Sequence, residues 1–131
     1  MFTIFLNSPS FGYSHPLKTA FLKGLTPEVK FGIYKKPIDK RNVSIEHITP
    51  KSKGGKLSFD NIFLADKFEN SKRGTRPIEE IINKFDIFDY LQQWLNVKNQ
   101  YVDGIRYIKG ILQRFNLKYQ EFISYISNKR G

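Results

Sequence analysis

Residues 44–74 contain side chains that can carry out chemistry, at a spacing that distinguishes this stretch from the rest of the chain. Glu46 and His47 are adjacent, Asn61 follows fourteen residues after His47, and Asn70 follows nine residues after Asn61. A neutral imidazole can take a proton from water near pH 7, as a hydrolytic reaction requires. A histidine in isolation is more often structural, so the argument depends on the residues around it.

The stretch resembles the HNH (ββα-metal) endonuclease motif. The shared landmarks, in chain order, are Glu46-His47, Pro50, Gly54-Gly55, Asp60-Asn61 and Asn70. The resemblance covers about a quarter of the chain. A motif predicts a function only together with its structural context, which here is two strands followed by a helix.

The resemblance implies a role for each of four residues. His47 would be the general base, Glu46 and Asn70 would bind a divalent metal, and Asn61 would brace the loop near His47 without taking part in the chemistry. Two oxygen ligands from protein suit Mg²⁺ or Mn²⁺ better than Zn²⁺. Glu46 and His47 are neighbours on a predicted strand, so their side chains should point to opposite faces unless the strand end twists.

The chain is strongly basic, with 22 basic and 12 acidic residues and a formal charge of +10. Such a field attracts polyanions, and nucleic acid is the default partner, although a basic protein need not use its charge specifically. Several basic side chains fall in or near the motif and are candidates for phosphate contacts: Lys51, Lys53, Lys56, Lys67, Lys72, Arg73 and Arg76. His15 lies outside the motif and is predicted to be incidental.

Hydrophobic patterns predict the elements that would position these residues. The predicted strands are Phe2–Leu6, Val29–Tyr34, Val43–Ile48 and Asn61–Ala65. A short helix is predicted within Thr19–Leu25, and the motif helix is predicted over Lys67–Arg73, with Asp66 as its N-cap and Gly74 after its end. A third helix is predicted to start at Pro77 and reach Leu95. A fourth is predicted over Tyr101–Ile126, with a break at Asn116.

These elements predict an α+β fold: a ββα-metal HNH core with N-terminal strands and a C-terminal helical extension. At 131 residues a single domain is expected, with residues 1–42 as strands and loops, 43–76 as the motif and 77–131 as helices. The chain has no cysteine, which excludes the zinc knuckle found in many HNH proteins, so the hydrophobic core must replace it. No apolar stretch could span a membrane, and the N-terminus is a poor secretory signal, so an intracellular location is expected.

The leading hypothesis is a metal-dependent endonuclease that acts on double-stranded DNA. One site per chain would produce a nick, and a double-strand cut would need a homodimer or two events. The alternative is a non-catalytic nucleic-acid-binding subunit of a ribonucleoprotein, such as an organellar ribosome. A third, weaker hypothesis is a protein-interaction module built on the C-terminal helices. The sequence leaves open the choice between DNA and RNA and the target sequence.

Overall fold

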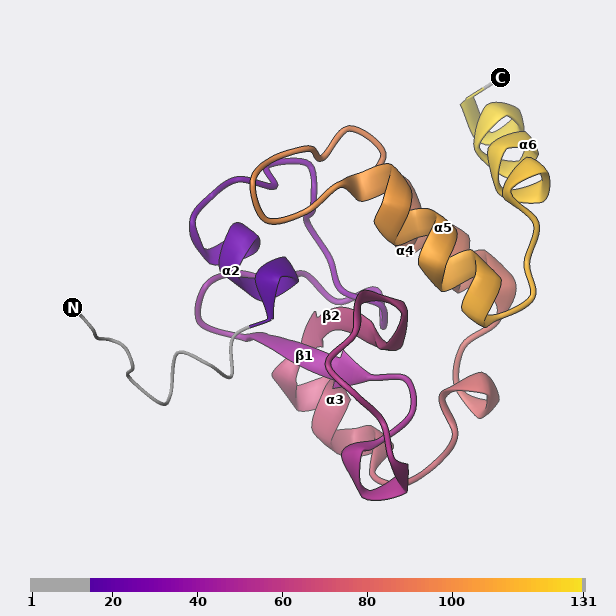
Figure 1. Ribbon diagram of the computed structural model, residues 1–131. Coiled ribbons are helices and arrows are strands. Elements are labelled where there is room, and N and C mark those ends of the chain that lie inside the picture. The colour runs from indigo at the N-terminus through magenta and orange to yellow at the C-terminus, as the bar shows by residue number, and fades with distance from the viewer. Residues whose placement is uncertain (1–14, 131) are drawn as a thin grey trace.

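A two-stranded antiparallel sheet and the helix that follows it form the centre of the computed structural model, which describes residues 15–130 (Figure 1). Strand β1 (Val43–His47) pairs with β2 (Ile62–Asp66), so that Ile45 lies opposite Leu64. Helix α3 (Lys67–Arg73) begins directly after β2. Within residues 43–76 the predicted β-β-α order is therefore confirmed, with strand ends that differ by one residue.

Local signals explain both ends of α3. The Asp66 side chain accepts hydrogen bonds from the backbone N–H groups of Phe68 and Glu69, at 3.2 and 3.1 Å, and so acts as the predicted N-cap. Gly74 follows Arg73 with φ of 61°, a conformation that favours glycine, and the helix ends there. The helix packs against both strands and presents Asn70 and Arg73 to β1.

Strand β1 pairs with one edge of β2. The other edge of β2 is covered by two tyrosine side chains and a turn. The Leu64 N–H donates to the Tyr90 hydroxyl at 2.9 Å, and the Tyr107 hydroxyl donates to the Ile62 carbonyl at 2.7 Å. The Ile33 N–H donates to the Leu64 carbonyl at 2.9 Å. All five β2 residues are buried, so these partners satisfy polar groups that have no access to water.

The segment before β1 differs from its prediction. Val29–Tyr34 does not form a strand: Phe31 makes an isolated bridge to Pro37, and the chain turns between these two residues. The turn packs closely on β2, because a Cβ at Gly32 would lie 2.6 Å from the Ala65 Cα. Helix α2 (Pro16–Leu22) begins before the helical stretch expected within Thr19–Leu25. The strand predicted at Phe2–Leu6 lies outside the described residues.

Helices α4 (Lys84–Gln92), α5 (Gly104–Arg114) and α6 (Tyr119–Arg130) follow the motif. The prediction of one helix from Pro77 to Leu95 was wrong: residues 78–80 form only a 3₁₀ turn, and Asn83 starts α4 through a capping box with Asp86. The predicted break at Asn116 is confirmed, since Asn116 has φ of 58° and separates α5 from α6.

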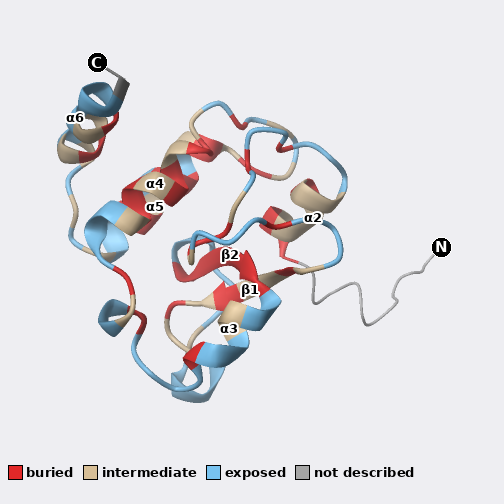
Figure 2. Cartoon of the chain, turned by 180° about the vertical axis from the view of Figure 1, so that it is seen from behind, coloured by how far each residue is buried: buried red, intermediate tan, exposed pale blue. Residues whose placement is uncertain are grey.

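One hydrophobic core connects these parts of the chain. It extends from Leu17 in α2 through β2 to Ile126 in α6, with the buried sides of α4 and α5 packed toward the sheet (Figure 2). Aromatic rings make up much of it, and Trp94, Tyr90 and Tyr107 are in mutual contact. The described part of the chain is thus an α+β fold with five helices. None of its helices is long and apolar enough to cross a membrane.

Candidate functional site

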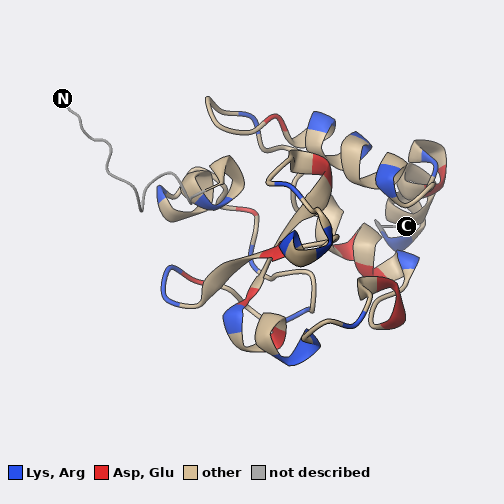
Figure 3. Cartoon of the chain, turned by 60° about the horizontal axis from the view of Figure 1, so that its bottom comes forward, with Lys and Arg blue, Asp and Glu red and all other residues tan. Residues whose placement is uncertain are grey.

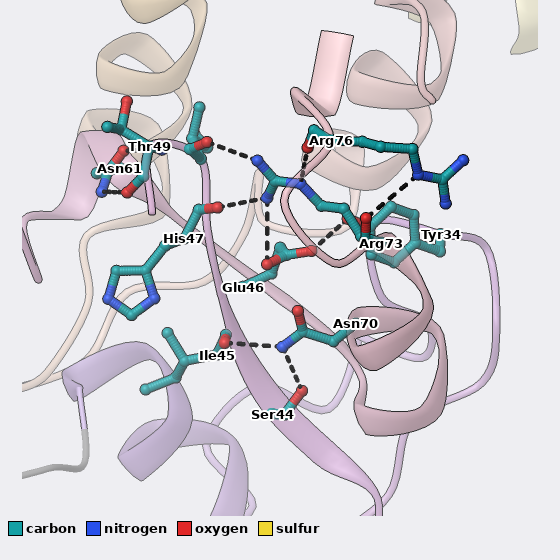
Figure 4. Close-up of polar contacts among 11 residues, drawn as sticks. Tyr34, Ser44, Ile45, Glu46, His47, Thr49, Asn61, Asn70, Arg73 and Arg76 are labelled. Carbon is teal, nitrogen blue, oxygen red and sulfur yellow. Dashed lines mark hydrogen bonds and ion pairs between the residues drawn. The ribbon is translucent and has the colours of Figure 1, made fainter. Parts of the chain in front are cut away.

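The alternation of β1 divides the motif residues between two sides of the strand. Ser44 and Glu46 point toward α3, whereas Ile45 and His47 point to the opposite side (Figure 4). Regular pairing continues to His47, opposite Ile62, so the strand end does not bring Glu46 and His47 to one face. The structure therefore groups Glu46 with Asn70 and leaves the His47 imidazole across the strand.

Glu46 is 5% exposed, and both oxygens of its carboxylate have partners. Oε1 lies 3.3 Å from Nη1 of Arg73, and the Tyr34 hydroxyl donates a short hydrogen bond to Oε2. Burial raises the pKa of Glu46, and this effect outweighs the opposing effects of Tyr34 and Arg73. The carboxylate is thus held inside the protein by donors from the chain itself.

Arg73 is 4% exposed and uses its guanidinium entirely within the protein. Besides the contact with Glu46, Nη1 donates to the His47 carbonyl at 2.6 Å and Nη2 to the Ile48 carbonyl at 3.0 Å. Nε donates to the Arg76 carbonyl at 2.7 Å. Arg73 was predicted to lie at the surface as a phosphate contact, and this prediction was wrong: the side chain is in the interior and binds the carbonyls at the end of β1.

Asn70 lies on α3 beside β1. Its amide nitrogen donates to the Ser44 hydroxyl at 3.2 Å and to the Ile45 carbonyl at 3.0 Å. Its Oδ1 makes no hydrogen bond with the described residues, so this oxygen atom near Glu46 remains available as a metal ligand. The pair of a carboxylate and an amide oxygen is of the type that Mg²⁺ and Mn²⁺ prefer. Within residues 15–130 no group of three or more His, Cys, Asp and Glu residues is placed to hold a metal.

The His47 imidazole is partly buried, and its Nε2 has no hydrogen-bond partner among the described residues. Burial lowers the pKa of His47, and the positive charges of Lys51 and Arg73 lower it further. The imidazole is therefore neutral at neutral pH, the state in which it can accept a proton.

Asn61 braces the loop after β1 through its side chain, as expected for a supporting residue. It is 3% exposed; its Oδ1 accepts from the Thr49 N–H at 2.8 Å, and its Nδ2 donates to the carbonyls of Thr49 and Lys56 at 3.0 and 2.9 Å. A residue that the sequence analysis missed completes this network: Nη1 of Arg114, in α5, donates to the same Oδ1 at 3.0 Å. Fifty-three positions separate the two residues, so no local pattern could reveal the contact.

His15, predicted to be incidental, is also part of the support. It is buried, its Nδ1 accepts from the Leu17 N–H at 3.1 Å, and its ring packs edge-on against Phe59 in the loop between the strands. Burial lowers the pKa of His15 to about 4, and the charge of His47 acts in the same direction. No bond to a candidate ligand of the site involves His15, so its role in the fold is to join α2 to the loop.

The remaining basic candidates lie at the surface around the motif. Figure 3 marks Lys and Arg positions on the loop and on α3 in blue. The exposed ones are Lys51, Lys53, Lys56, Lys67, Lys72 and Arg76. Lys72 forms an ion pair with Glu69 at 3.0 Å, and the Lys67 ammonium lies 5.5 Å from the ring centroid of Phe68. Arg76 donates to the Arg73 and Lys72 carbonyls and so caps the end of α3.

No protein-family model matches the chain, and no curated protein is significantly similar to it. The case for a function therefore depends on the motif residues and on the geometry described above.

Proposed function

We propose that this protein is a metal-dependent nuclease of the HNH type that hydrolyses phosphodiester bonds in double-stranded DNA and nicks one strand per chain. The observation that supports the proposal most is the placement of Glu46 and Asn70 on one side of the β-β-α unit, with Asn70 Oδ1 unpartnered among the described residues. His47 ends the same strand on the opposite face, so a phosphate would have to lie across the end of β1 to meet both Glu46 and His47.

Each residue has a distinct task in this proposal. Glu46 and Asn70 would hold a Mg²⁺ or Mn²⁺ ion, which supplies Lewis acidity toward a phosphate oxygen and the leaving oxygen. His47, kept neutral by its lowered pKa, would accept the proton of the attacking water. Asn61 and Arg114 fix the loop that begins at Thr49 and so keep the end of β1 in place.

A plasmid-nicking assay with Mg²⁺ or Mn²⁺ tests the proposal. We expect the wild type to nick, and His47→Ala to lower the rate by at least about 100-fold, as loss of a general base does. Asn70→Ala should raise the metal concentration needed for activity. Asn128→Ala, at an exposed position on α6, is the matched control and should nick normally. The proposal fails if the wild type binds DNA and nicks with neither metal, and the metal assignment fails if Asn70→Ala behaves as the wild type does.

A second candidate function is favoured by one observation, the buried pair between Glu46 and Arg73. A carboxylate neutralised by the chain itself suits a domain that binds nucleic acid without cutting it, such as a subunit of a ribonucleoprotein. The basic surface would serve that function equally well. The same assay decides between the two candidates, because the second predicts binding in a mobility-shift experiment and no nicking with any divalent metal.

A further inference from the structure

We propose that Arg73 and Tyr34 compete with the divalent cation for Glu46, so that these two internal donors set how tightly the site binds metal, with the charged guanidinium as the stronger competitor. The inference rests on the function proposed above, because it concerns the same carboxylate. It adds two residues that control metal affinity to the residues that would bind the metal.

Two donors already occupy the Glu46 carboxylate. Nη1 of Arg73 lies 3.3 Å from one oxygen, and the Tyr34 hydroxyl bonds the other. Both side chains of the ion pair are almost fully buried: the exposed fraction of the side chain alone is 3% for Arg73 and 6% for Glu46. A cation that binds Glu46 must therefore displace one of these donors or share an oxygen with it.

Sharing is opposed by charge. Two cations on one buried carboxylate repel each other, and screening by water is weak in the protein interior. Arg73 cannot move away freely, because three backbone carbonyls also hold its guanidinium: those of His47, Ile48 and Arg76. The guanidinium thus remains beside the carboxylate and lowers the affinity of Glu46 for a second positive charge.

The other expected ligand is not blocked in this way. Asn70 directs its amide nitrogen to β1, and its Oδ1 makes no hydrogen bond with the described residues. The two expected metal ligands therefore differ: the Asn70 amide oxygen is available, whereas the Glu46 carboxylate is already bound by Arg73 and Tyr34. Removing the charge of Arg73 or the hydroxyl of Tyr34 should then tighten metal binding, although the metal ligands Glu46 and Asn70 are unchanged.

The test is a Mn²⁺ titration of the full chain without nucleic acid, in which electron paramagnetic resonance measures the free ion. Arg73→Gln removes the charge and keeps hydrogen-bond donors, and we expect it to bind Mn²⁺ at least about tenfold more tightly than the wild type. Tyr34→Phe frees one oxygen of Glu46 with little change in shape, and we expect a smaller gain of about threefold. This second variant decides the matter if Arg73→Gln does not fold.

Three controls make the result specific. Arg76→Gln removes a neighbouring positive charge that makes no contact with Glu46, and should change the affinity by less than about twofold. Tyr101→Phe removes a hydroxyl that has no hydrogen bond within the described residues, and should have no effect. Glu46→Gln should abolish the gain in an Arg73→Gln background, because the ligand is then lost.

The outcomes separate this inference from the proposed function. Tighter Mn²⁺ binding by Arg73→Gln or Tyr34→Phe, accompanied by a larger rise in melting temperature on adding Mn²⁺, supports the competition. If the wild type, Arg73→Gln and Tyr34→Phe bind Mn²⁺ with equal affinity and Glu46→Gln does not bind it, the competition is overturned and the proposed metal site stands. Absence of Mn²⁺ binding in the wild type and in every variant overturns both.

Discussion

At the scale of single residues, His15 and His47 respond to burial in the same direction. Burial lowers the pKa of each, to about 4 for His15, and the charge of His47 contributes to the shift at His15. In both cases the folded protein favours the neutral imidazole. The unfolded chain, in which a histidine titrates near its ordinary pKa of about 6.5, binds protons more readily at mildly acid pH.

We therefore predict that the free energy of unfolding falls as the pH is lowered from about 6.5 to about 4, the interval between the unfolded and folded pKa values of His15. The sign follows because the unfolded state holds more protons across this interval. The loss due to His15 should be on the order of 2 kcal/mol. Urea denaturation at a series of pH values measures it.

His15→Asn is the matched variant, because asparagine can still cap α2 and does not titrate. Its stability should depend less steeply on pH than that of the wild type. The comparison isolates His15 from Glu46, whose raised pKa changes stability in the opposite direction, toward greater stability as the pH falls. Parallel pH profiles for the two proteins would show that His15 does not cause the dependence.

At the scale of elements, Tyr90 and Tyr107 take the place of a neighbouring strand beside β2. Their hydroxyls lie 3.1 Å apart and bond to the Leu64 N–H and the Ile62 carbonyl. All four groups are buried, so the loss of one hydroxyl leaves another group without its partner. The two tyrosines thus act as one unit and not as separate contacts.

We predict that Tyr107→Phe lowers the free energy of unfolding by about 1–3 kcal/mol, because it leaves the Ile62 carbonyl unsatisfied. Tyr90→Phe should cost a similar amount. The double variant should cost less than the sum of the two, by at least about 0.5 kcal/mol. Chemical denaturation of the three variants gives the coupling energy directly, with Tyr101→Phe as the control. Additive effects would contradict the shared network.

The elements also show which parts of the fold could be predicted from sequence. The two motif strands, α3 and the break at Asn116 carry local signals: alternation, the Asp66 cap, and a residue tolerant of positive φ. Val29–Tyr34 was misjudged as a strand because its alternation is local, whereas its turn is fixed by packing of Gly32 on Ala65. The start of α4 was misjudged because Pro77 was preferred to Asn83, which forms the capping box.

The candidate site follows the same division. The positions of Glu46 on β1 and of Asn70 on α3 were predicted correctly from local sequence patterns, whereas Asn61, expected to open the second strand, ends the 3₁₀ turn before β2. The partners of these residues were not predictable, because Arg114 and Tyr34 reach the motif from outside it, and Arg73 turns inward from α3. Whether a basic residue near a helix end faces solvent or the interior depends on tertiary packing, which composition does not record.

At the scale of the whole molecule, the net charge of +10 is unevenly used. On α4 and α6 the acidic residues are paired with lysines: Asp86 with Lys35, Asp89 with Lys129, and Glu121 with Lys84. By contrast, Lys51, Lys53 and Lys56 make no ion pair with the described residues and extend from the loop next to the candidate site. The side of the molecule that carries the loop and α3 is therefore the one expected to meet a polyanion.

We predict that affinity for double-stranded DNA falls steeply with salt, and that Lys53→Gln reduces the slope of log K against log salt by about 0.9, the value for one lost phosphate contact. Lys118→Gln, at an exposed position between α5 and α6, should leave the slope unchanged. Fluorescence anisotropy with one duplex between 50 and 200 mM salt, about the range in which such slopes are measured, gives both values. Equal slopes for the two variants would exclude Lys53 as a phosphate contact.

The side chains along the sheet have a consequence for self-association. An exposed strand edge can recruit a strand from another chain, which is a common route to aggregation and to strand-swapped dimers. Here Tyr90, Tyr107 and Ile33 occupy the free edge of β2, while Asn70 and Arg73 occupy carbonyls of β1 that face away from β2. A third strand would have to displace these groups on either side. Any pairing of two copies of this chain should therefore use its helices or loops and leave each sheet at two strands.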